Sequence, residues 1–375
     1  MKHRAVLLQA LIALYYPFLF LICGVLALAL VAIVWLLIAV RWMPMVVPML
    51  LMIGALILGA LVHMVLGMRG LWSRPAVPNE EHSIKLSRKK CPELFGLVDR
   101  VAEERQLTGP DRIRIASDTI AHVFEDDEQK RVLVLGALAV SNFSQAALEG
   151  ILAHELAHFS AGDTRALRRS MARHAVMVYV ETGLRTRGML RLNPIVWLVH
   201  GYHALYSLVW ASVARDQEFA ADRKSVEQAG KEVTAAALIH IHVSERLPWV
   251  RLSSIAEATV QNNRTIKQLF TEHAARAKAI DEFEWQQACQ KELEQPTGLF
   301  QHHPCLKERL AAIGVSPKKA LKLALANSGD PVSGLIPDWA AIEQELTNRL
   351  IAVFAEQWQA KLEMRQIIVG RPFRA

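Results

Sequence analysis

Residues 148–158 read Leu148-Glu149-Gly150-Ile151-Leu152-Ala153-His154-Glu155-Leu156-Ala157-His158. Two histidines four positions apart lie on one face of a helix, one turn from each other, so both imidazoles reach the same metal ion. The glutamate after the first histidine then lies beside the water that the metal activates. This HExxH pattern predicts a zinc centre for peptide hydrolysis, with His154 and His158 as ligands and Glu155 as the base.

The flanking residues predict the helix that this pattern requires. Ser144 is a suitable N-cap and Gly162 a suitable residue just past the C-terminus, which gives a helix of about 17 residues. Leu148, Ile151 and Leu152 form its apolar face. The motif is therefore expected on a helix that packs one face into a core.

A third ligand is expected because catalytic zinc takes three protein ligands and keeps one position open for water. The segment 215–222 offers Glu218 and Asp222, one turn apart on a single helical face. Glu218 is predicted to bind the metal, and Asp222 to accept a hydrogen bond from a ligating imidazole and so fix its tautomer. The alternative is that both acids are solvated or pair with Arg215 or Arg223.

The N-terminal region contains two long apolar runs. No charged residue occurs from Ala5 to Val40, and after Arg41 the next charge is Arg69. A helix that crosses a bilayer needs about 20 apolar residues, so we predict a transmembrane helical hairpin over about 11–38 and 45–67. The alternative is a cleaved signal peptide. The first run is too long for one, and no small-x-small cleavage site precedes the second run.

Basic residues lie on the outer flanks of the hairpin. Lys2 and Arg4 precede it, six basic residues follow it between Arg69 and Lys90, and only Arg41 lies in the turn. The positive-inside rule therefore predicts a multi-pass protein of the inner, cytoplasmic membrane whose ends and catalytic domain face the cytoplasm. The net charge of +7 suits a domain close to anionic lipid, and without a dense basic and aromatic patch no nucleic-acid partner is expected. The four cysteines form no CxxC pair, which agrees with a reducing compartment.

The rest of the chain predicts mostly helices with a small sheet. A helix is expected over 92–107, strands over 112–115 and 132–135, a solvated acidic turn over 125–128 after residues 121–124, and a further helix over about 339–361. The fold class is mainly α with a small β-sheet, a zincin-like α+β metallopeptidase domain behind the hairpin. The predicted parts are the hairpin (1–70), a basic juxtamembrane linker (71–90), the peptidase domain (91–315) and a C-terminal helical extension (316–375).

A long helix is expected from Asn193-Pro194 to Gly230, and its first part, 192–214, carries no charge. One membrane crossing there would separate His158 from Glu218 and prevent a shared metal. We therefore predict that 192–214 is a buried or membrane-contacting helix and not a third span. His200 and His203 within it are expected to be core or interface residues and not ligands.

The chain resembles the HtpX-type membrane zinc metallopeptidases, the group that also includes the CAAX prenyl proteases. The matching features share one order along the chain: the hairpin, residues 148–158, Asp163, the block 218–222, and a later His303-Pro304-Cys305-Leu306-Lys307-Glu308-Arg309 segment. The resemblance covers about residues 90–315. It implies one Zn²⁺ per chain held by His154, His158 and Glu218, with Glu155 as general base.

The resemblance also assigns supporting roles. Asp222 and Asp163 are expected to support the ligands, and His303 or Arg309 to stabilise the oxyanion or gate the site. A structural role at a helix entry is equally open for His303. The group typically carries two further membrane segments between the motif and the glutamate, which this chain does not clearly show. The usual Asn-Ala-Phe appears here as residues 121–124, which leaves substrate preference open.

The expected function is a membrane-anchored endopeptidase that acts on membrane or misfolded proteins, with protein or peptide substrates and the lipid bilayer as partners. An extended substrate is expected to add to the sheet near 121–135. The alternatives are a prenyl-protein protease, an inactive scaffold that keeps the fold, and a structural zinc module. The last usually closes with four ligands, often cysteines, and no cysteine falls near the motif. The oligomeric state is not predicted.

Overall fold

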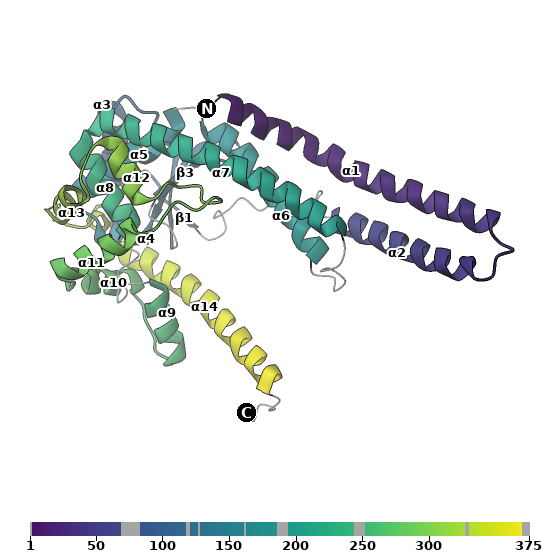
Figure 1. Ribbon diagram of the computed structural model, residues 1–375. Helices are drawn as coiled ribbons and strands as arrows, with labels where there is room; N and C mark the ends of the chain where they lie inside the picture. The colour runs from purple at the N-terminus through teal and green to yellow at the C-terminus, as the bar shows by residue number, and fades with distance from the viewer. Residues whose placement is uncertain are drawn as a thin grey trace. The chain divides into compact units, whose positions relative to one another are not determined.

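The computed structural model describes residues 2–68, 83–117, 121–126, 128–160, 163–185, 194–243, 252–326 and 330–369 (Figure 1). It is mainly helical with a small mixed sheet, as predicted. The elements in chain order are α1 (Lys2–Ala39), α2 (Val46–Gly67), β1 (Ser83–Lys85), α3 (Pro92–Glu104), β2 (Arg112–Ala116), β3 (Ala121–Glu125), β4 (Arg131–Gly136), α4 (Ala137–Asn142), α5 (Gln145–Ser160), α6 (Asp163–Arg185), α7 (Pro194–Ala229), α8 (Lys231–Val243), α9 (Leu252–Gln261), α10 (Leu269–Lys278), α11 (Glu282–Leu293), α12 (Leu306–Ile313), α13 (Pro317–Ala326), η4 (Val332–Leu335) and α14 (Trp339–Val369).

Two compact units divide the chain differently from the predicted boundaries. The first unit comprises 1–76, 166–216 and 298–303, and the second comprises 77–165, 217–297 and 304–375. Part of the predicted peptidase domain, including most of α6 and the first part of α7, thus belongs with the hairpin. The apolar side chains of these helices explain the grouping, because α6 and α7 share one buried cluster with α1 and α2.

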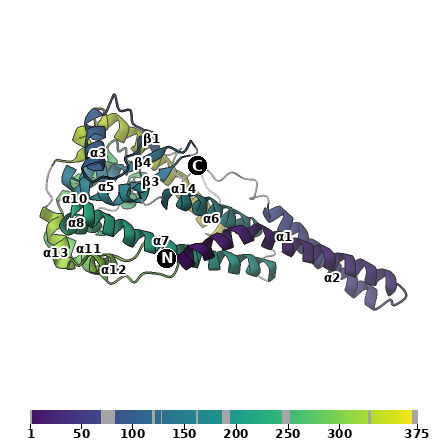
Figure 2. The same cartoon turned by 90° about the horizontal axis from the view of Figure 1, so that it is seen from above.

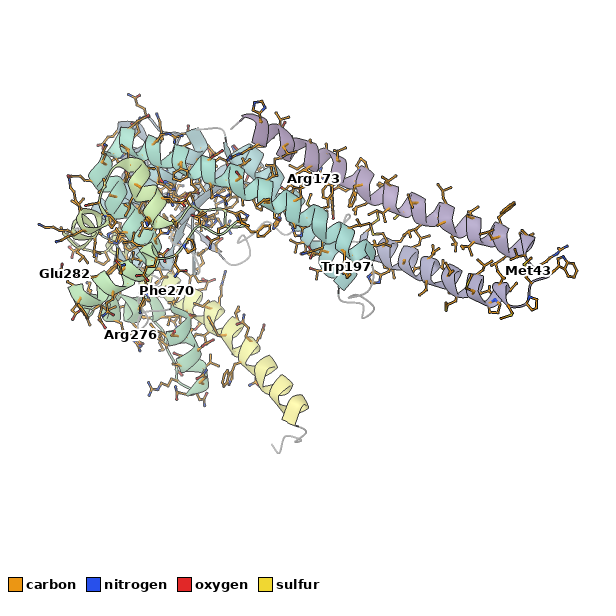
Figure 3. All side chains as sticks on the ribbon, viewed as in Figure 1. Met43, Arg173, Trp197, Phe270, Arg276 and Glu282 are labelled. Carbon is orange, nitrogen blue, oxygen red and sulfur yellow. The ribbon has the colours of Figure 1, made fainter. Side chains whose placement is uncertain are left out.

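The first unit begins with the predicted hairpin. Helices α1 and α2 lie side by side (Figures 1 and 2), and Met43 lies in the turn that joins them (Figure 3). The apolar stretches His3–Ala39 and Val46–Leu66 are each long enough to cross a membrane. Their outward side chains are largely apolar and exposed, as for Leu28 at 72%. Such a surface is suited to lipid.

Helices α6 and α7 pack one face each against the hairpin. Met177 and Tyr206 are fully buried in the shared cluster. Arg173 of α6, labelled in Figure 3, hydrogen-bonds to the Tyr16 hydroxyl and lies over its ring. The opposite face of α7 carries exposed apolar residues such as Trp197, which is 63% exposed. The start of this helix at Pro194 and its end at Ala229 agree with the prediction.

The second unit contains the sheet, with strand order β1-β2-β4-β3. Strand β2 pairs in parallel with β4, with Ile113 opposite Leu133, and β1 and β3 pair antiparallel at the two edges. Both predicted strands are present. Strand β1 falls inside the predicted linker 71–90, where its three residues are too few to show an alternating pattern.

The prediction of a solvated acidic turn over 125–128 is wrong for Asp126. This carboxylate is 3% exposed, pairs with Arg112, and accepts hydrogen bonds from the backbone N–H groups of Glu128 at 3.0 Å and Lys130 at 2.8 Å. Glu125 is the last residue of β3. A run of acids favours a solvated turn by composition alone, but here the turn folds around one buried carboxylate that satisfies its own backbone donors.

Helix α5 forms the centre of the second unit. The backbone N–H of Ala147 donates to the Ser144 hydroxyl at 3.3 Å, which is the predicted N-cap. Leu148 and Leu152 are fully buried in the main core with α3 and the sheet. On another side α5 approaches α8 at Gly150, where a Cβ atom would lie 3.0 Å from Val233 Cγ1. The predicted helix end at Gly162 lies outside the described residues.

Candidate metal centre

The residues predicted as ligands come together in the second unit. Helix α5 presents His154 and His158 one turn apart, with ring centroids 5.1 Å apart. Helix α7 brings Glu218 to them: Glu218 Oε2 lies 3.5 Å from His154 Nε2, and Glu218 Oε1 lies 3.9 Å from His158 Nε2. One ligand atom from each residue lies within 4.8 Å of the others. Within the described part of the chain, no other group of three metal-binding side chains meets this distance limit.

This geometry suits a single metal ion. Ligands about 2.0–2.2 Å from a tetrahedral zinc are about 3.3–3.6 Å from each other. The separation between His154 and Glu218 falls in that range, and the one between His158 and Glu218 needs only a small adjustment. Two imidazole nitrogens and one carboxylate oxygen are also the donor set typical of catalytic zinc.

The charges around the cluster support a cation at this place. Glu218 and Asp222 are buried, and Glu155 is partly buried on the same turn as the histidines. The buried cation beside them is Arg309, which is 1% exposed. With neutral histidines, these three carboxylates and this guanidinium, counted alone among the described side chains, sum to a formal charge of −2. Buried charge of this kind is costly unless it is compensated, and a divalent cation compensates it.

Asp222 lies directly behind His154. Its Oδ1 is 3.1 Å from His154 Nδ1, and the residue is only 1% exposed. Burial alone would raise the pKa of this carboxyl, but hydrogen bonds from Arg309 and His154 lower the pKa to about 2. The carboxylate is therefore ionised at neutral pH and fixes the His154 tautomer that leaves Nε2 free for a metal.

The hydrogen-bond partners of His154 favour the protonated form of its imidazole. Burial alone would lower the pKa of its imidazole, but the hydrogen bonds to Asp222 and Glu218 raise the pKa to about 10. A ligating histidine must be neutral, so a metal that binds here has to displace this proton.

Arg309 comes from α12, far along the sequence from the motif. Its Nε donates to Asp222 Oδ2 at 2.8 Å and its Nη2 donates to Asp222 Oδ1 at 2.7 Å. The same Nη2 lies 3.3 Å from Glu218 Oε2 and 3.3 Å from His154 Nε2. The guanidinium is thus a buried partner of the residues around the metal position.

The sequence also singled out His303, Asp163 and two histidines of α7. His303 lies in the loop 298–303, which belongs to the first unit. Asp163 is the first residue of α6, and its side chain lies outside the described residues. His200 and His203 both hydrogen-bond to Glu181 of the same unit. The side chain of His203 is largely buried, whereas that of His200 is 53% exposed and is not a core residue.

Two residues near the cluster were missed. His242 of α8 lies 3.3 Å from Arg309 Nη1, and Glu292 of α11 lies 3.6 Å from His242. No sequence spacing connects them to the motif. The one available signal was the placement of histidines in the apolar run Ala235–Val243.

The fold and this site define the chain as a membrane metallopeptidase, with two helices apolar enough to span a bilayer. The sequence profile of peptidase family M48 matches residues 91–315. The chain belongs to peptidase family M48, and the resemblance to HtpX-type enzymes is confirmed. The alternative function of a prenyl-protein protease is not better supported than that of an HtpX-type metallopeptidase.

Individual relatives are distant. The chain is 22% identical over 249 residues to the "Protease HtpX homolog" of Bacteroides fragilis (strain YCH46), a match that covers 61% of this chain and 70% of the relative. It is 27% identical over 207 residues to the "Protease HtpX" of Actinobacillus pleuropneumoniae serotype 5b (strain L20). This match covers 50% of this chain and 70% of the relative. The crystal structure of S. mikatae Ste24p aligns at 15% identity with a TM-score of 0.33, over 79% of this chain and 66% of that chain.

Proposed function

We propose that this chain is a zinc-dependent endopeptidase of the cytoplasmic membrane, with one Zn²⁺ per chain and a catalytic domain that faces the cytoplasm. Its proposed substrates are membrane or misfolded proteins. The observation that carries the proposal is the convergence of His154, His158 and Glu218 around one position, with a net negative charge that a divalent cation balances.

The proposed reaction is hydrolysis of a peptide bond. When bound, zinc supplies the Lewis acidity that makes water a nucleophile near neutral pH. His154, His158 and Glu218 hold the ion. Glu155 removes a proton from the attacking water and delivers it to the nitrogen of the leaving amine. Because Glu155 is on the same turn as both histidines, it stays next to the reacting atoms without being a ligand.

The buried carboxylate and guanidinium have positioning roles in this proposal. Asp222 accepts a hydrogen bond from the Nδ1–H group of His154, and so directs Nε2 to the metal. Arg309 holds Asp222 through two hydrogen bonds and is too deeply buried to meet a substrate oxyanion directly. We therefore assign Arg309 to positioning. A role for His303 as oxyanion donor, and a supporting role for Asp163, stay predictions.

The test of this proposal is Glu155→Gln in the purified full-length protein. The variant is expected to contain about one zinc per chain by elemental analysis, as the wild type does, and to lose casein cleavage by about 10²- to 10⁴-fold. Glu149→Gln is the matched control, because Glu149 lies on the same helix and pairs with Arg100 instead of the cluster. Full cleavage by Glu155→Gln would remove Glu155 as the base, and zinc-loaded wild type without cleavage would favour the inactive scaffold.

The proposed orientation has its own test. In sealed inverted membrane vesicles, added protease is expected to digest the region after residue 83. In right-side-out spheroplasts the same region is expected to be protected. Digestion in spheroplasts would contradict a cytoplasmic catalytic domain.

A further inference from the structure

A row of buried polar side chains continues behind Arg309, away from the metal position. Arg309 Nη1 lies 3.3 Å from His242 Nε2, and His242 Nδ1 lies 3.6 Å from Glu292 Oε1. Both residues are largely buried, with side chains 13% and 9% exposed. Helices α8, α11 and α12 thus each contribute one of these polar side chains, beside an apolar cluster formed by the same helices.

The three nitrogens of the Arg309 guanidinium face two groups of partners. Nε and Nη2 donate to Asp222, and Nη2 also lies close to Glu218. Nη1 faces His242. Since the two nitrogens toward the cluster point to one side, the His242 contact is what holds the opposite edge of the guanidinium.

The protonation of His242 follows from this contact. A guanidinium only donates hydrogen bonds, so the Nε2 atom facing it has to accept. The neutral ring then carries its proton on Nδ1, on the side of the Glu292 carboxylate. The contacts therefore form a series in which each side chain orients the next and which ends at the proposed metal. Its members, in order, are Glu292, His242, Arg309, Asp222 and His154.

We infer that His242 and Glu292 are positioning residues that set the metal affinity of the His154–His158–Glu218 site by holding Arg309 against Asp222. This inference rests on the proposed zinc function. Without His242, the guanidinium loses the partner of Nη1 and is free to turn toward Glu218 Oε2, already 3.3 Å from Nη2. Arg309 then competes with the metal for the Glu218 carboxylate, so zinc binding weakens.

The competing explanation is that His242 only fills space between α8 and α12. In that case a leucine of similar volume keeps zinc affinity and alters only the free energy of unfolding. A glutamine separates the two explanations further. Its amide oxygen can accept from Arg309 while its amide nitrogen donates toward Glu292, so it can replace both contacts of the imidazole.

The experiment measures the zinc dissociation constant of the full-length protein in detergent by competition with a chromophoric chelator. His242→Leu is expected to weaken zinc binding about tenfold, the lower end of effects seen for residues behind metal ligands. His242→Gln is expected to restore binding to near the wild-type value. The matched control is His240→Leu, since His240 is buried on the same helix but packs against Phe143. This control is expected to leave zinc affinity unchanged even if it lowers the melting temperature.

The outcomes separate this inference from the proposed function. If the wild type binds no zinc, the proposed function and this inference both fail. If the wild type binds zinc and His242→Leu binds it equally well, only the inference fails. Should His242→Leu not fold, Glu292→Gln replaces it, because this variant removes only the charge that orients His242. Unchanged zinc affinity in Glu292→Gln would then overturn the inference, and weaker zinc binding in Glu292→Gln would support it.

Discussion

Asp222→Asn changes one oxygen to an amide group and leaves the shape of the side chain intact. In the wild type, Asp222 Oδ1 accepts from both Arg309 Nη2 and His154 Nδ1, at 2.7 Å and 3.1 Å, and Oδ2 accepts from Arg309 Nε at 2.8 Å. Asparagine has only one oxygen acceptor. With the amide oxygen at the Oδ1 position one of these three donors meets an NH₂ group, and with the amide turned over two of them do.

Each orientation has a defined cost. If the amide oxygen stays at the Oδ1 position, the NH₂ group faces Arg309 Nε, and a buried donor loses its partner at a cost of about 1–3 kcal/mol. If the amide turns over, the NH₂ group faces both Arg309 Nη2 and His154 Nδ1. It then favours the His154 tautomer with its proton on Nε2, which blocks the ligand atom. Loss of such an orienting partner weakens metal binding about 10- to 100-fold, which equals about 1.4–2.7 kcal/mol.

The assay is the zinc dissociation constant, measured with a competing chelator beside a melting curve of the metal-free protein. Glu227→Gln is the matched control, because Glu227 is an exposed carboxylate on the same helix that pairs with Lys224. The reasoning predicts weaker zinc binding in Asp222→Asn and wild-type binding in the control. Equal zinc affinity in Asp222→Asn and wild type would refute the claim that Asp222 orients His154.

Further predictions concern packing and pH. Gly150→Val is expected to lower stability by about 1–3 kcal/mol in a melting experiment, because the new side chain would overlap Val233, only 3.0 Å from a Cβ atom there. At Gly96 an added Cβ atom meets nothing within 4 Å, so Gly96→Ala is expected to stabilise α3 by about 0.5–1 kcal/mol. Equal effects of the two substitutions on stability would contradict the close packing of α5 against α8 at Gly150. Hydrogen bonds from Arg131 lower the pKa of Asp111 to about 2, so this pair stabilises the fold above about pH 4 and the stabilisation is lost as the pH falls toward 2. Asp111→Asn should remove this part of the acid sensitivity of the melting temperature, and an unchanged pH profile would exclude the pair.

The ligand set could be predicted because it depends on local spacing. His154 and His158 are one helical turn apart, and Glu218 and Asp222 are one turn apart on a second helix. Each pair is fixed by the geometry of a single helix. The sequence thus supplied two such pairs, and a metal that needs three ligands predicts that the two helices meet. The hairpin could also be predicted from the sequence, because long runs of apolar residues without a charge are typical of membrane-spanning helices.

The remaining features depend on contacts between distant segments. Arg309 reaches Asp222 across 87 positions in sequence, and His242 reaches Arg309 across 67. No periodicity within either segment encodes such a contact. The burial of Asp126 was missed for the same reason, because its partner Arg112 lies on another strand. The grouping of α6 and the first part of α7 with the hairpin likewise depends on tertiary packing. The composition shows that these helices have apolar faces, but it does not show which faces pack together.

The most direct test of the zinc site follows metal content and casein cleavage in one sample. The purified full-length chain is stripped with a chelator, and zinc is then returned in steps while bound zinc and cleavage rate are recorded. Cleavage is expected to be absent in the stripped protein and to rise in proportion to bound zinc, reaching its plateau at one zinc per chain, whereas Glu218→Ala should bind zinc far more weakly. Cleavage that persists without zinc, or a Glu218→Ala variant that binds and cleaves like the wild type, would contradict a zinc peptidase built on His154, His158 and Glu218.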